Sequence, residues 1–176
     1  RKAAAFVTAN NPLVKSYSKN IAANIRSDDR DLLDLNFRIG MGLFEALTLH
    51  GTGYVVDPSS AYINKSGNEA SVDFVQFPSE TLAYQAGDCD DLSVLYNAML
   101  EASGIETAFI TAPGHIFTAY SLGISMERAG RIFSDTSNLI DFDGKAWVPV
   151  EVTLVEKGFL EAWRVGAREW KETTQA

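Results

Sequence analysis

The chain has 176 residues, of which 46% are hydrophobic and 22% charged, a composition typical of a folded domain rather than of a disordered chain. Its formal net charge of −8 argues against nucleic acid as a partner, because phosphate backbones are bound by basic surfaces. No apolar run is long enough to cross a bilayer, and a single cysteine, Cys89, excludes an internal disulfide and any metal site built from several thiolates.

Residues 1–9 are small and basic, and we interpret them as a lead-in or linker to one domain that spans residues 10–176. The sequence starts at Arg1 without a methionine, so we expect a processed or trimmed chain. This expectation leaves open a removed targeting segment and membership of a larger multi-domain protein.

Two helices are predicted in the first 50 residues. Asn10-Asn11-Pro12 joins a polar cap to a proline in the first turn, a combination that favours a helix start. A second helix is predicted from about residue 31 to residue 49. Its interior glycines, Gly40 and Gly42, indicate close packing or a kink.

An irregular stretch separates these helices from the cysteine. Residues 54–71 are rich in Gly, Ser, Asn and Asp, which predicts a loop-like excursion. Its triplet at residues 64–66, Asn-Lys-Ser, matches a glycosylation acceptor, a pattern that often arises by chance. Residues 77–80, Phe-Pro-Ser-Glu, then predict a short helix that is capped by Ser79.

The stretch at residues 87–91, Gly-Asp-Cys-Asp-Asp, directly precedes an amphipathic helix. The apolar residues that follow at helical spacing are Leu92, Leu95, Tyr96, Met99 and Leu100. Ser103-Gly104 marks the end of this helix. Cys89 therefore lies at a helix N-terminus, where the helix dipole and unpaired N–H groups favour negative charge. A thiol in such a place ionises more readily than a free thiol, and the thiolate is the nucleophile.

Short strands follow this helix. Residues 106–112 and 115–120 flank Pro113-Gly114 and predict an antiparallel hairpin. Further strands are predicted at residues 132–133, 139–140 and 146–153, and the proline in the last one, Pro149, indicates an edge position or a bulge.

The remaining predicted elements are a helical turn at 125–131, a hairpin turn at Asp143-Gly144 and a closing helix. The aromatic residues expected to form the core between the last strand and this helix are Trp147, Phe159, Trp163 and Trp170. Helices that precede a set of antiparallel strands indicate an α+β fold. We expect the N-terminal helices and the cysteine helix to pack on an antiparallel sheet, with a C-terminal helix closing the domain.

Three residues of this pattern form a candidate catalytic set: Cys89 at a helix start, His115 at a strand start, and Glu151 inside a later strand. If the three side chains meet, His115 accepts the thiol proton and Glu151 orients the imidazole and stabilises its charged form. The backbone N–H of Cys89 would contribute to an oxyanion hole. Each residue taken alone is more often structural, since a lone cysteine is usually a small buried hydrophobe.

The motifs at residues 87–91, at 114–117 (Gly-His-Ile-Phe) and at 147–153 (Trp-Val-Pro-Val-Glu-Val-Thr) resemble those of the transglutaminase-like superfamily in type and order. The resemblance covers residues 78–153 and implies a papain-like core in which the cysteine helix packs on an antiparallel sheet. It also implies that Cys89 is the nucleophile, His115 the general base and acid, and Glu151 the residue that orients the histidine.

Two features depart from this family. Its third residue is usually aspartate, whereas glutamate stands at position 151; the other acids considered for this role are Asp135, Asp141 and Asp143. Residues 123–145 are longer than the family's hairpin, and we interpret them as an insertion that serves as a flap or as a partner surface.

The polar residues next to Cys89 allow further interpretations. Asp88, Asp90 and Asp91 suggest a calcium or magnesium site, but acidic residues in the first turn of a helix are ordinary partners of its dipole, which is the interpretation we prefer. Asp91 is also considered as a brace for the loop that carries His115. Gln85 is a candidate oxyanion side chain, although a solvated helix residue is the simpler interpretation.

The leading hypothesis is a cysteine peptidase or amidase that cleaves a peptide or isopeptide amide through a Cys89 thioester. Two alternatives stay open: an inactive transglutaminase-like module that binds a peptide or a cell-wall ligand, and a cross-linking transglutaminase. We expect a peptide or protein substrate, no cofactor, no metal and no nucleic acid. The compartment stays open between an extracytoplasmic or periplasmic location, reached with a targeting segment since removed, and the cytoplasm.

Overall fold

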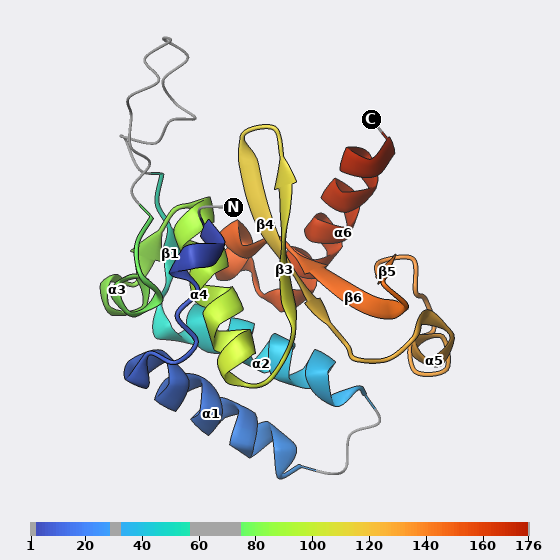
Figure 1. Cartoon of the computed structure of the whole chain (residues 1–176), viewed down its shortest axis with the longest axis horizontal. Helices are drawn as coiled ribbons and strands as arrows, with labels where there is room; N and C mark the ends of the chain where they lie inside the picture. The colour runs from blue at the N-terminus through green and yellow to red at the C-terminus, as the bar shows by residue number, and fades with distance from the viewer. Residues whose placement is uncertain (1–2, 29–32, 57–74, 176) are drawn as a thin grey trace.

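A computed structural model describes residues 3–28, 33–56 and 75–175, which form an α+β fold (Figure 1). Its helices are η1 (Ala3–Phe6), α1 (Pro12–Arg26), α2 (Leu35–His50), α3 (Pro78–Tyr84), α4 (Cys89–Ala102), α5 (Met126–Ala129), η2 (Val152–Lys157) and α6 (Phe159–Gln175). Its strands are β1 (Gly53–Tyr54), β2 (Ala86–Gly87), β3 (Thr107–Ala112), β4 (His115–Ser121), β5 (Ile140–Phe142) and β6 (Lys145–Val150). Most of the predicted excursion and its glycosylation triplet lie outside the described residues.

Local capping determines where the first two helices begin. The Asn11 side chain accepts a hydrogen bond from Leu13 N at 3.0 Å, which confirms the predicted start of α1. The second helix starts later than predicted, at Leu35, because Asp34 caps it by accepting from Phe37 N at 3.0 Å. Gly51 ends this helix in the left-handed conformation, with φ 84°.

The two glycines of α2 allow close packing, as predicted, and Gly40 packs against the core. A Cβ at Gly40 would lie 2.3 Å from the ring of Tyr120, which is fully buried. The carbonyl of Gly40 also accepts a hydrogen bond from the hydroxyl of Tyr96 at 2.9 Å. A Cβ at Gly42 would instead meet the end of the flexible Ile25 side chain. Position 40 is therefore restricted to glycine by the buried ring of Tyr120.

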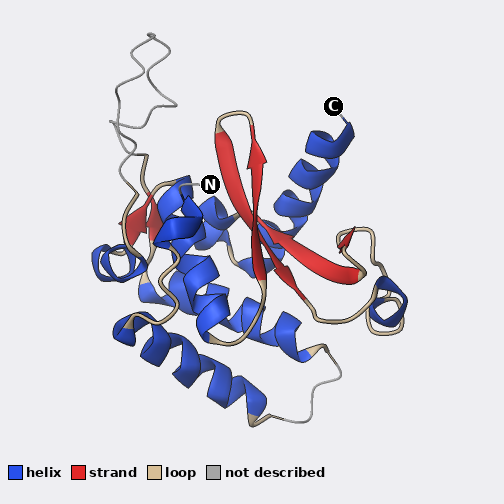
Figure 2. Ribbon diagram, viewed as in Figure 1, coloured by secondary structure: helices blue, strands red, loops and turns tan. Residues whose placement is uncertain are grey.

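The main sheet is antiparallel, with the strand order β3-β4-β6-β5. Side chains alternate across β4, so Thr118 and Tyr120 face α4 while Phe117 and Ala119 face the other side. The first face joins α1, α2 and α4 in the larger core, and the second packs with Trp170 of α6 in a smaller cluster. Figure 2 shows the sheet between the group of α1, α2 and α4 and the C-terminal helix α6.

Strand β6 is not an edge strand, which corrects the interpretation of its proline. β6 lies between β4 and β5, but β5 pairs with it only from Lys145 to Trp147. Pro149 lies beyond that pairing, so on this side its missing N–H removes no ladder bond. Helix α6 covers the open side there: a Cβ at Gly166 would lie 2.9 Å from the backbone of Pro149 and Val150. The strand also ends at Val150, so Glu151 follows β6 instead of lying within it.

The interpreted insertion, residues 123–145, leaves from the end of β4 and returns at the start of β6. The predicted strand at 132–133 is wrong: these residues form a turn after α5, and Phe133 packs its ring 5.1 Å from that of Phe37 in the larger core. Apolar contact with α2 therefore outweighs the β-propensity of this short segment. The Asp143-Gly144 turn is confirmed, with positive φ at both residues.

Two other local details differ from the predictions. Helix α3 is not capped by Ser79; its N-cap is Phe77, whose backbone N donates to Glu80 Oε2 at 2.8 Å. The segment interpreted as a lead-in contains η1, and its Phe6 ring lies 5.1 Å from the ring of Phe77. Among the described helices, none combines the length and the hydropathy that a membrane crossing needs.

We expect Gly40→Ala to destabilise the protein by about 1–3 kcal/mol, because the new methyl group would overlap a buried ring that cannot move aside. Gly42→Ala is the matched control on the same helix, since Ile25 can rotate away and alanine favours the helix by up to about 1 kcal/mol. Urea unfolding of the two variants measures the difference. Equal stabilities for both variants would contradict the packing argument.

Candidate active site

Cys89 is the first residue of α4, and its side chain is largely buried, with 7% of the residue exposed. Asp88 caps this helix, with its Oδ1 accepting from the backbone N atoms of Asp90 at 3.0 Å and Asp91 at 3.2 Å. The first helical backbone bond runs from Leu92 N to Asp88 O. The helix ladder therefore does not use the N–H of Cys89, as expected at a helix N-terminus.

The chain that leads to Cys89 is held by the small parallel pair β1–β2. In this pair Tyr54 lies beside Gly87, two residues before the thiol. A Cβ at Gly87 would lie 2.6 Å from Cβ of Asp91, so the tight approach of the strand to the helix requires glycine here.

The three aspartates have separate roles, and two of them are structural, as preferred from the sequence. Asp88 is the cap, and Asp91 accepts from Gln76 N at 2.7 Å and from Asp88 N at 3.3 Å. Asp90 lies at the thiol itself, with its Oδ1 3.9 Å from Sγ of Cys89. A cation on the other side of the thiol would offset this negative charge.

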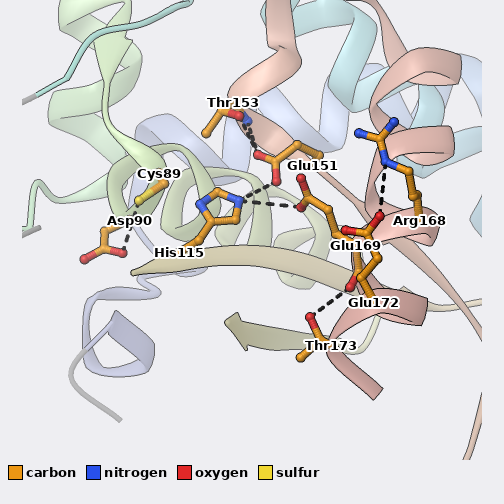
Figure 3. A network of polar contacts seen from close by, with 9 residues as sticks. All are labelled: Cys89, Asp90, His115, Glu151, Thr153, Arg168, Glu169, Glu172 and Thr173. Carbon is orange, nitrogen blue, oxygen red and sulfur yellow. Dashed lines mark hydrogen bonds and ion pairs between the residues drawn. The ribbon is translucent and has the colours of Figure 1, made fainter. Parts of the chain in front are cut away.

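His115 stands at the first position of β4 and supplies that cation. Its Nε2 lies 2.5 Å from Oε2 of Glu151, and its ring stacks on Phe117 with centroids 5.9 Å apart. Figure 3 shows the Cys89 side chain on the opposite side of the imidazole, toward the nitrogen that Glu151 does not use. His115 thus lies between the thiol and the carboxylate, and the structure brings together the three side chains of the candidate set.

Glu151 is held rigidly, with a side chain only 3% exposed. One carboxylate oxygen accepts from the backbone N and the hydroxyl of Thr153, at 3.0 and 2.5 Å, which leaves the other oxygen for His115. The backbone N of Glu151 donates to Ala162 O of α6 at 3.0 Å. Because Glu151 caps η2 and is tied to α6, its orientation does not depend on lying within β6.

The charges of this group reinforce one another. Contact with the Cys89 thiol and then with Glu151 raises the pKa of His115 to about 10, against the effect of burial. Burial is the largest single influence and disfavours the Glu151 carboxylate, but the hydrogen bonds from His115, Glu169 and Thr153 together outweigh it, and the pKa of Glu151 lies below its usual value. Across the neutral range the pair is therefore imidazolium and carboxylate.

The other acids considered for the third position do not reach the histidine in this way. Asp135 accepts hydrogen bonds from Ser137, while Asp141 and Asp143 belong to the β5–β6 hairpin at the opposite end of β6 from Glu151. The candidate oxyanion residue Gln85 caps α3 and donates its side-chain amide to the carbonyl of His50.

Two neighbours of the site were missed from the sequence. Oε2 of Glu169 in α6 lies 3.7 Å from Nε2 of His115. Burial raises the pKa of the Tyr54 phenol, and the nearby charges of Cys89 and Asp88 raise it further. Glu169 is one of several acids on a polar helix face, and Tyr54 belongs to a two-residue strand. Neither position carries a local signal that sets it apart.

His115, Glu151 and Glu169 also form the kind of donor set that binds divalent metals, since one ligand atom from each lies within 4.8 Å of the others. A metal on Nε2 would have to displace the proton that His115 shares with Glu151, and the high pKa of His115 opposes this. A hydrogen-bonded imidazole–carboxylate pair fits these residues better than a metal site does.

The site opens to a pocket of about 340 Å³ next to His115. The pocket lies between the β3–β4 turn and the last turns of α6, and it is lined by Ala112, Pro113, His115, Glu169, Glu172 and Thr173. Comparisons with models of protein families, with curated proteins and with solved structures find no match for this chain.

We expect Glu151→Gln to lower the pKa of His115 from about 10 toward the ordinary value of about 6.5, because an uncharged amide no longer stabilises the imidazolium. Titration of isotope-labelled histidine by NMR measures this, since the chain has only two histidines and His50→Gln assigns their signals. Glu127→Gln, an exposed change in α5, serves as the control. An unchanged His115 titration in Glu151→Gln would contradict the assigned pairing.

Proposed function

We propose that this chain is a thiol-dependent acyl-transfer enzyme of the transglutaminase-like type, which hydrolyses a peptide or isopeptide amide. The observation that carries the proposal is the imidazole of His115, held between the thiol of Cys89 and the buried carboxylate of Glu151 (Figure 3). A nucleophile, a base beside it and a third group that orients the base are what covalent amide chemistry needs.

In the proposed reaction, Sγ of Cys89 forms a bond to the amide carbon, and the carbonyl oxygen takes the negative charge. His115 then gives its proton to the amine as the C–N bond breaks, which leaves a thioester on Cys89. A water molecule then loses a proton to His115 and attacks the thioester; the C–S bond breaks, the carboxylic acid leaves, and the Cys89 thiolate is restored beside the protonated His115. Glu151 keeps the imidazole in place through both steps, because its other oxygen is fixed by Thr153.

Donors for the oxyanion are available on the same side of the helix start. The N–H of Cys89 is not used by the α4 ladder, and the raised pKa of Tyr54 keeps its phenol protonated as a second possible donor. Both groups come from the β2–α4 corner, where Tyr54 lies beside Gly87.

The arrangement of elements supports the transglutaminase-like assignment. Cys89 begins a helix that packs on an antiparallel sheet, His115 begins β4, and Glu151 directly follows β6, the strand paired with β4. This is the order and the type of element that the motif resemblance implies. The third group is glutamate instead of the family's usual aspartate, and it stands one residue beyond the end of β6.

A second candidate is an inactive module of the same fold that binds a peptide or a cell-wall ligand. The observation in its favour is that Cys89 is only 7% exposed and that the Asp90 carboxylate lies 3.9 Å from its Sγ, so little of the sulfur is open to a substrate carbonyl. A cross-linking transglutaminase would share the acylation step and differ only in using an amine instead of water as the acceptor.

The test is the rate of Cys89 alkylation by iodoacetamide as a function of pH. At pH 6 we expect the parent to react about tenfold or more faster than His115→Ala, because a free thiol, with a pKa of about 8.5, is almost fully protonated there. The single cysteine makes the measurement site-specific. His50→Gln, at the only other histidine, is the matched control and should react like the parent.

If the parent and His115→Ala instead react alike, with the pH dependence of a free thiol, the proposed Cys–His pair is absent and the binding module becomes the better candidate. If the pair is present, a screen of peptide and isopeptide amides with Cys89→Ala as the blank identifies the substrate. Release of free amine without an added amine acceptor would distinguish hydrolysis from cross-linking.

A further inference from the structure

Two carboxyl groups compete for one nitrogen in this site. Oε2 of Glu151 lies 2.5 Å from Nε2 of His115, and Oε2 of Glu169 lies 3.7 Å from the same atom. A nitrogen that bears one proton makes one good hydrogen bond, and the shorter distance assigns it to Glu151. Glu169 is therefore close to the pair without sharing its hydrogen bond (Figure 3).

The surroundings of Glu169 do not balance a second negative charge. Among the described residues its Oε2 is buried and has no hydrogen-bond partner, although one oxygen of Glu151 lies within 4.8 Å. The charged groups around it are His115 of β4, Glu151 after β6, and Arg168 and Glu172 of its own helix. Arg168 is paired with Glu172 at 3.9 Å, and His115 is bonded to Glu151.

We propose that Glu169 is a positioning residue that works in its protonated form, with its carboxyl O–H directed at the Glu151 carboxylate. The proton gives the buried oxygen its missing partner and leaves one negative charge, shared by two carboxyl groups, opposite one imidazolium. This role rests on the function proposed above, because it regulates the histidine of the same site.

The energetics agree with this geometry. Burial and then the neighbouring Glu151 carboxylate raise the pKa of Glu169 to about 7. Together these two influences outweigh the charges of His115 and Arg168, which lower the pKa. Two acids that face one cation hold a proton between them because both cannot ionise at low cost. Glu169 thus loses its proton within the physiological range, whereas Glu151 stays ionised there.

Ionisation of Glu169 would make His115 a weaker proton donor. A second negative charge 3.7 Å from Nε2 holds the proton on His115 more firmly, so proton delivery to the leaving amine weakens. Above about pH 7 the site would then lose amide turnover.

The experiment follows the imidazole of His115 by NMR in the isotope-labelled chain of residues 1–176, in EDTA, from pH 5 to 9. In the parent we expect the ring signals to shift with a midpoint near pH 7 while His115 itself stays protonated, which reports ionisation of Glu169. Glu169→Gln, neutral at every pH and able to donate an N–H to Glu151, should remove this midpoint. Glu172→Gln, the exposed acid of the same helix and pocket, should keep it.

A parent without the midpoint, or a midpoint that survives in Glu169→Gln, would overturn the proposal. A merely structural role for Glu169 would not produce a pH-dependent signal that the glutamine variant abolishes. The outcome is separate from that of the alkylation test: a free-thiol profile for Cys89 removes the proposed function whether or not the His115 signal reports Glu169. The same titration in Cys89→Ser shows directly whether the coupling needs the thiol.

Discussion

The hydrogen bond from His115 to Glu151 is the contact on which the rest of the site depends. It joins the first residue of β4 to the residue that follows β6, and the β4–β6 ladder, which ends at the pair Thr118–Val150, brings this end of β6 near the start of β4. Glu151 is 3% exposed, so its carboxylate persists only with a cation beside it. The imidazolium that stabilises the buried carboxylate is the same group that the thiol needs.

The thiol reaches this pair through a different part of the fold. The start of α4 lies at the end of the sheet where β4 begins, and it is held there by the β1–β2 pair, by Gly87 and by the Asp88 cap. Within the larger core, the rings of Tyr96 and Tyr120 pack α4 against β4. Residues 123–145 attach at the other end of the same strands and so extend the core rather than cover the site. One end of the sheet carries the candidate chemistry and the other end carries the added stability.

Sequence reasoning succeeded where the cause is local. The cap at Asn11, the helix start near Cys89 and the Asp143-Gly144 turn involve residues within three or four positions, and these elements form as predicted. It failed where distant segments decide. Phe133 packs on α2 instead of joining a strand, Pro149 is covered by a helix that comes later in the chain, and Glu169 joins the site only because α6 returns along β6. Neither the alternation nor the helical spacing of apolar residues near these positions predicts those contacts.

The close approach of α6 to β6 has a consequence for how such a site could evolve. Gly166 touches the backbone of Pro149 and Val150, one helical turn before Glu169 and just before the strand ends at Glu151. A side chain at position 166 would collide with this backbone, so α6 would have to move away from β6. Glu169 would then move away from His115 with the helix. The place of Glu169 beside His115 thus depends on a residue that touches neither the thiol nor the carboxylates, so the geometry of the candidate site constrains position 166 to the smallest amino acid.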